Sequence, residues 1–128
     1  MKNCLQEKYG LFINGQWQPA SDGKTFKSYN PANGELLAEC AQATDADLDL
    51  AVDSAWKAWD SWKQTTPAER AKILNRIADI IDENTEHLAM VETLDNGKPI
   101  RERMAIDFRY SAEVFRYCAG AVRAEVGS

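Results

Sequence analysis

The stretch TPAERAKILNRIADIID, residues 66–82, carries the clearest fold signal in the chain. Thr66 supplies a capping hydroxyl, Pro67 stands at the first helical position, and Glu69 completes a capping box, so a helix is predicted to begin here. Because apolar residues then recur at helical spacing, the helix is predicted to be amphipathic. Its expected buried face comprises Ile73, Leu74, Ile77, Ile80 and Ile81.

A second helix is predicted upstream, from Thr44 to about Lys63. The Thr44 hydroxyl can cap the free amides, and Asp45 and Asp47 favour the positive end of the helix dipole. The three tryptophans close together in this segment are interpreted as packing anchors rather than as a ligand cage. The expected core stripe, at steps of three and four, comprises Leu48, Val52, Ala55, Trp59 and Trp62.

Two further helices are predicted downstream. One begins near Thr85 and ends at Asn96–Gly97, where glycine can adopt the left-handed conformation common at helix C-termini. The other begins at Pro99 and ends before Gly127. Its stripe could pack on a core or on another subunit, and comprises Ile100, Met104, Phe108, Ser111, Phe115, Cys118 and Val122.

Before the helices, the chain shows two hairpin patterns. Residues 11–18 read LFINGQWQ, in which Asn14–Gly15 suits a tight two-residue turn between strands. Residues 25–29 and the alternating segment from Leu36 to Ala41 flank a second turn. The order of hairpins and helices predicts an α+β fold with a flexible stretch over 1–10, hairpins over 11–43 and helices over 44–126.

Composition limits the classes of function. The chain has 128 residues, 45% of them hydrophobic, and a net charge of −5 with acidic and basic residues interspersed. This pattern argues against a surface built for nucleic acid or for an anionic membrane. No apolar run approaches the roughly 18 residues of a membrane span, and the first residues lack the apolar centre of a signal peptide, so we expect a cytoplasmic protein.

Candidate catalytic groups are scarce. The seven glycines form neither a dinucleotide fingerprint nor a phosphate-binding loop. Cys4, Cys40 and Cys118 are widely spaced and lack a basic neighbourhood that would activate a nucleophile, so we interpret them as free thiols. The single histidine, His87, is expected to be exposed near a helix start. We therefore assign no catalytic residue and no cofactor-binding residue.

Several motifs together point to a family. The segments LFINGQW, NPANGE and ETLDNGKP resemble, in order and at their intervals, the opening of the NAD(P)-dependent aldehyde dehydrogenase superfamily. TPAER and FRYCAG resemble segments of the same family, and the similarity extends from Tyr9 onward. The ending RAEVGS is most similar to bacterial acetaldehyde-oxidising members. These segments occupy residues 11–17, 30–35, 92–99, 66–70, 115–120 and 123–128.

The resemblance implies an N-terminal fragment of the α/β aldehyde dehydrogenase fold. In that family a cysteine thiolate attacks the aldehyde, hydride passes to NAD or NADP, and a glutamate-activated water releases the carboxylic acid. The cysteine, the glutamate and nearly all cofactor contacts lie C-terminal to the matched region. We therefore expect this chain to be inactive by itself and to bind neither NAD nor NADP tightly.

A few site residues follow from the resemblance alone. Ser28, Tyr29 and Asp95 match positions that help coordinate a structural monovalent cation, largely through backbone oxygens. Tyr110 matches a position that lines the substrate entrance, although a partly exposed helix residue without such a role is the alternative interpretation.

Two other roles remain open for the chain as a whole. It could be a non-catalytic helical module for interaction or oligomerisation, or a truncated remnant. Uncovered apolar faces would favour self-association, or association with the missing C-terminal part of a dehydrogenase. An aldehyde substrate is expected only for the full-length enzyme.

Overall fold

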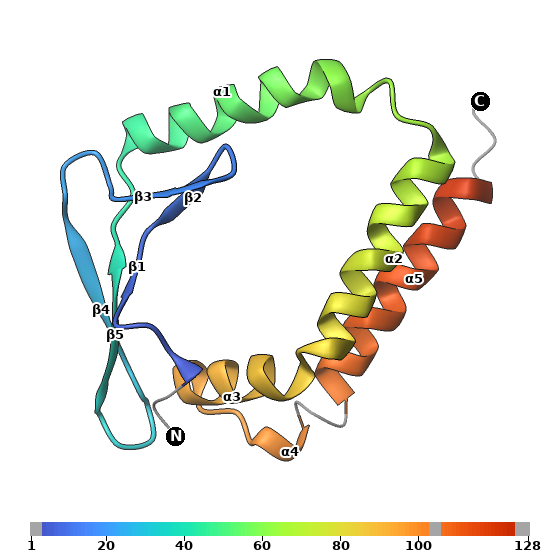
Figure 1. Ribbon diagram of the computed structural model, residues 1–128. Helices are drawn as coiled ribbons and strands as arrows, with labels where there is room; N and C mark the ends of the chain where they lie inside the picture. Colours follow the sequence, from blue (N-terminus) through green and yellow to red (C-terminus); the bar gives the residue numbers. More distant parts are fainter. Residues whose placement is uncertain (1–3, 103–105, 125–128) are drawn as a thin grey trace. The chain divides into compact units, whose positions relative to one another are not determined.

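The computed structural model describes residues 4–102 and 106–124 (Figure 1). The strands precede the helices, which confirms the predicted α+β class. The chain divides into two compact units, Met1–Gln64 and Thr65–Ser128, each with its own internal packing. In the part of the chain that is described, no helix is long and apolar enough to cross a membrane.

The first unit contains five short strands. β4 and β5 pair antiparallel, and β1 joins the other side of β5 in parallel, which gives a three-stranded sheet of order β1-β5-β4. β2 and β3 form a separate antiparallel hairpin, in which Asn14 and Gly15 both have positive φ, as the Asn–Gly turn predicted. The bounds are Lys8–Tyr9 (β1), Leu11–Ile13 (β2), Gln16–Gln18 (β3), Thr25–Tyr29 (β4) and Leu36–Ala41 (β5).

Strand β1 lies inside the stretch 1–10 for which flexibility was predicted. Lys8 pairs with Glu39 and Tyr9 with Cys40. A two-residue strand carries no periodicity of its own. Its order depends on β5, which lies some thirty residues later and offers a free edge.

Helix α1, Asp45–Trp62, begins at the predicted cap. Thr44 and Asp47 form a capping box, and Asp47 is the buried residue of the helix. The predicted core stripe is instead exposed: Leu48 is 61% and Trp59 47% accessible, and the other tryptophans of the helix are similarly open. Spacing predicts that an apolar face exists, but burial also needs a partner, and the contact of α1 with β2 is small compared with that between α2 and α5.

The second unit is helical, with α2 at Pro67–Glu83, α3 at Thr85–Asn96, α4 at Ile100–Glu102 and α5 at Phe108–Ala124. α2 and α5 lie side by side (Figure 1). They run antiparallel. The end of α5 lines a groove together with the start of α2, and the middle of α5 contacts the end of α2.

Alanines form the centre of the α2–α5 interface. Four of them are at most 2% exposed: Ala71, Ala78, Ala112 and Ala119. By contrast, Ile73 and Ile80 of the predicted buried face are each 44% exposed. Small side chains let two helices approach closely, so the alanine side of α2 meets α5 and the isoleucines lie to the side. The prediction chose the more apolar stripe rather than the closer-packing one.

The predicted helix from Pro99 onward is described as two elements, α4 and α5. Met104 of its stripe lies outside the described residues, as do the last residues of the predicted helical region, 125–126. Along α5 the fully buried positions are Ala112 and Ala119, each one residue after a predicted stripe member. The contact face is therefore rotated slightly from the face that the larger side chains suggested.

Candidate functional site

Ser28 and Tyr29, two of the predicted cation ligands, lie at the end of β4. Ser28 pairs with Ala38 and Tyr29 with Leu36, and the register shifts between the two. An irregularity of this kind bends the strand and redirects its backbone groups. The next residue, Asn30, is buried and closes the turn with its side-chain oxygen. Main-chain oxygens at such a bend suit the type of coordination that was predicted.

The third predicted ligand, Asp95, lies in the last turn of α3 and is exposed. It belongs to the helical unit, whereas Ser28 and Tyr29 belong to the strand unit. The described residues also contain no group of three or more His, Cys, Asp or Glu that could hold a metal. The three-residue cation site stays a prediction.

Tyr110, the predicted entrance residue, lies on α5 and is 70% exposed. It shares one side of the helix with Val114 and Tyr117, which are 40% and 77% exposed. The spacing of these three residues is helical, so they form a second apolar face of α5. Sequence analysis missed Val114 and Tyr117 because it followed the other stripe of the same helix. The signal was present in their spacing from Tyr110.

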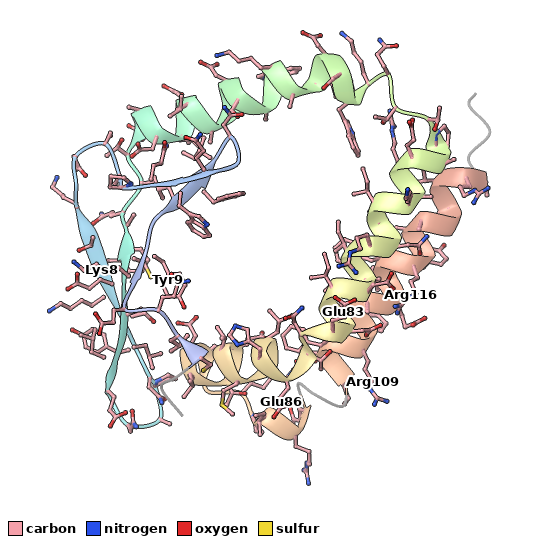
Figure 2. The ribbon with its side chains drawn as sticks, in the orientation of Figure 1. Lys8, Tyr9, Glu83, Glu86, Arg109 and Arg116 are labelled. Carbon is pink, nitrogen blue, oxygen red and sulfur yellow. The ribbon has the colours of Figure 1, made fainter. Side chains whose placement is uncertain are left out.

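Arg116 joins α5 to α2 (Figure 2). Its Nη2 donates to Asp82 Oδ2 at 2.6 Å and to Asp79 Oδ1 at 3.1 Å, and its Nη1 donates to Glu113 Oε1 at 3.2 Å. The hydrogen bonds to Asp82 and then Asp79 raise the pKa of the guanidinium above its already high value. With its charge met by three carboxylates, Arg116 holds the two helices in register rather than presenting itself to a ligand.

Asp47 is the centre of a polar network in the strand unit. Its carboxylate accepts hydrogen bonds from the backbone N–H of Thr44 at 2.9 Å and of Ser21 at 3.1 Å. Both hydroxyls also donate to it. The Thr44 backbone donor is the largest cause of a lowered pKa at Asp47. A carboxylate kept ionised and occupied in this way fastens the loop after β3 to the start of α1, and is a poor general base.

The remaining candidates for chemistry occupy structural positions. His87 is exposed, as predicted. Cys40 and Cys118 are free thiols, and all three cysteines, Cys4 included, are partly buried. Among the described glycines, those with positive φ stand in turns or at the end of α3, and Gly10 lies against the backbone of Gln18. These positions do not form the glycine-rich strand-to-helix turn that cradles a dinucleotide.

Comparison with known proteins identifies the family. The sequence model of the aldehyde dehydrogenase family matches residues 17–128. The chain is 48% identical to an aldehyde dehydrogenase of Rhodospirillum rubrum, over 98% of this chain and 25% of that protein. It is 45% identical to the fluoroacetaldehyde dehydrogenase of Streptantibioticus cattleyicolor, over 97% of this chain and 24% of that protein.

Solved structures agree with this match. The NAD+ complex of an aldehyde dehydrogenase from Bacillus cereus superposes with a TM-score of 0.92 at 41% identity, over 97% of this chain and 26% of that one. An indole-3-acetaldehyde dehydrogenase of P. syringae, in complex with NAD+ and IAA, gives a TM-score of 0.93 at 34% identity, over 99% and 26%. The chain belongs to the aldehyde dehydrogenase family. It spans about a quarter of the length of these relatives.

Proposed function

We propose that this chain acts as the N-terminal segment of an NAD(P)-dependent aldehyde dehydrogenase of the cytoplasm and does not catalyse the reaction alone. The observation that carries the proposal is the match itself: 98% of this chain aligns with 25% of a relative. In the whole enzyme an aldehyde becomes a carboxylic acid through a cysteine thiohemiacetal, and NAD or NADP accepts the hydride. The catalytic cysteine and glutamate belong to sequence beyond the matched segment.

In this role the chain provides a scaffold that the rest of the enzyme covers. Helix α1 exposes Leu48 and Trp59, and α5 exposes Tyr110, Val114 and Tyr117. Exposed apolar residues that share one side of a helix usually mark a surface that another segment covers. We propose that the remainder of the dehydrogenase is that segment, with Tyr110 at the substrate entrance and Ser28, Tyr29 and Asp95 at the monovalent cation.

The substrate class is proposed from the relatives. One relative is named fluoroacetaldehyde dehydrogenase, and the ending of this chain resembles acetaldehyde-oxidising members. A short aliphatic aldehyde such as acetaldehyde is therefore the first substrate to test. The choice between NAD and NADP depends on residues outside the matched segment.

Complementation tests the proposal directly. The chain would be purified alone and also co-expressed with the part of the Rhodospirillum rubrum relative that follows the matched segment. We expect no NADH or NADPH formation from acetaldehyde with either part alone, and formation when the two are co-expressed and co-purify. Turnover by the isolated chain above a heat-inactivated control would contradict the proposal, as would failure of the two parts to associate.

A non-catalytic interaction module is the second candidate, and the exposed faces of α1 and α5 favour it. A module should form an oligomer of defined mass by light scattering and should not restore activity to the remainder of the relative. A remnant without a role should aggregate without a defined mass. Light scattering on the same samples therefore separates the three interpretations.

A further inference from the structure

A groove of about 390 Å³ lies within the helical unit, between residues 68–79 of α2 and Arg123 in the last turn of α5. Ala68 and Ala71 of α2 contribute to its apolar lining. This groove is separate from the Tyr110 face of α5.

The groove is positively charged on a chain that is negative overall. Lys72, Arg76 and Arg123 line it together with one carboxylate, Asp79, which gives a formal charge of +2, whereas the whole chain carries −5. Asp79 is already engaged, because its Oδ1 accepts from Arg116 at 3.1 Å. The carboxylate excess of the chain therefore does not extend into this groove.

The three cations of the groove differ in the ion pairs that they form with the described residues. Arg76 donates to Glu83 at 3.0 Å, but no described residue forms an ion pair with Lys72 or Arg123. The nearby Glu69 is turned toward its own cap, where it accepts from the backbone N–H of Thr66 at 2.7 Å. Lys72 comes from α2 and Arg123 from α5, so the groove holds like charges from two helices, and the one carboxylate in its lining, Asp79, is bonded to Arg116.

We propose that this groove binds a phosphate dianion, with Lys72 and Arg123 as its principal ligands. A lysine supplies a compact positive charge and an arginine supplies paired donors that match phosphate oxygens. Asn75 adds an amide in the same lining. A bound dianion relieves the repulsion between the two cations and offsets the groove's charge. The site is independent of the proposed dehydrogenase role.

Titration of the purified chain with inorganic phosphate, followed by amide NMR shifts and by calorimetry, tests the site. We expect saturable binding, with shifts concentrated at the start of α2 and the end of α5. The double variant Lys72→Gln, Arg123→Gln removes two charge-assisted contacts and should weaken binding by at least about tenfold. The single variant Lys72→Arg keeps a positive charge at that position and should retain phosphate binding.

The matched control is Arg109→Gln. Arg109 is an exposed arginine at the opposite end of α5, outside the groove (Figure 2). Circular dichroism confirms that each variant keeps its helices. Non-saturable binding, equal shifts from chloride at the same ionic strength, or equal weakening by Arg109→Gln would overturn the proposal. None of these outcomes depends on dehydrogenase activity, so the two proposals fail separately.

Discussion

Helices α1 and α2 begin in the same way and end in different environments. Each opens with a capping box, Thr44 with Asp47 and Thr66 with Glu69. α2 then packs against α5 through fully buried alanines, whereas the apolar stripe of α1 remains open. Local sequence determines where a helix begins and which face is apolar. Whether that face contributes to stability depends on a second element that the helix's own sequence does not specify.

The largest effect should come from overfilling the α2–α5 interface. Ala78 is completely buried, so Ala78→Leu forces the two helices apart and should cost about 1–3 kcal/mol of unfolding free energy. Urea denaturation measures the change. The matched control is Ala55→Leu on the exposed surface of α1, which should change stability by no more than about 0.5 kcal/mol. Equal costs at the two positions would remove the distinction between the helices.

The two helix caps should differ by a smaller amount. Thr66→Ala removes the hydroxyl that accepts from the Glu69 N–H at 3.2 Å and should cost about 1 kcal/mol. Each hydroxyl also donates to the carboxylate of its own cap, Glu69 or Asp47, at 2.9 Å. Thr44→Ala should cost up to about 2 kcal/mol, because that hydroxyl has a further bond to Ser21 Oγ at 2.8 Å. Denaturation of both variants gives the comparison.

Serine at each position is the control for these caps. Thr44→Ser and Thr66→Ser keep the hydroxyl and should recover most of the lost stability. If Thr66→Ala proved the costlier substitution, the network around Asp47 would contribute less than its hydrogen bonds suggest.

These features also show how far sequence could predict the structure. The Asn14–Gly15 turn, the Thr44 cap, the Thr66–Glu69 capping box and the left-handed Gly97 are local patterns, and each was predicted at its residue. The pairing of Lys8 with Glu39 depends on residues distant in sequence, and so does the choice of Ala78 over Ile80 for burial. Pattern analysis ranks faces by apolarity, whereas close helix packing selects small side chains.

The candidate site residues show the same difference between local and long-range features. Exposure of Tyr110 could be predicted from its place on the helix, and its neighbours Val114 and Tyr117 could have been found from the same spacing. The position of Asp95 relative to Ser28 could not be predicted, because the two residues belong to different units. The ion pairs of Arg116 with Asp79 and Asp82 could not be predicted either, because the partners lie more than thirty residues apart in sequence.

Acidification should weaken both capped helices. The pKa of Asp47 is lowered chiefly by the backbone N–H of Thr44, and that of Glu69 by the backbone N–H of Thr66. Because each pKa is lower in the folded chain than in the unfolded one, the stabilisation is complete above the unfolded values near pH 4 and is lost as pH falls through the folded values. Melting temperatures measured from pH 7 downward should therefore fall most steeply below about pH 5.

Asp47→Asn separates the two contributions. This variant removes the ionised carboxylate of α1, so its melting temperature should depend less on pH than that of the native chain. Asp49→Asn, at an exposed position of the same helix outside the network, should leave the pH profile unchanged. An unaltered profile in Asp47→Asn would show that the network around Asp47 is not the source of the acid sensitivity.

The smallest effect on stability should come from the open face of α1. Trp56 is 66% exposed, so Trp56→Ser should change the unfolding free energy by no more than about 0.5 kcal/mol while lowering the average mass seen in light scattering, because it removes apolar surface available for association. Lys57→Ser, at the adjacent exposed residue, should leave that mass unchanged. A loss of stability comparable to that of Ala78→Leu would mean that α1 is packed as firmly as α2, and the contrast between the two helices would then be wrong.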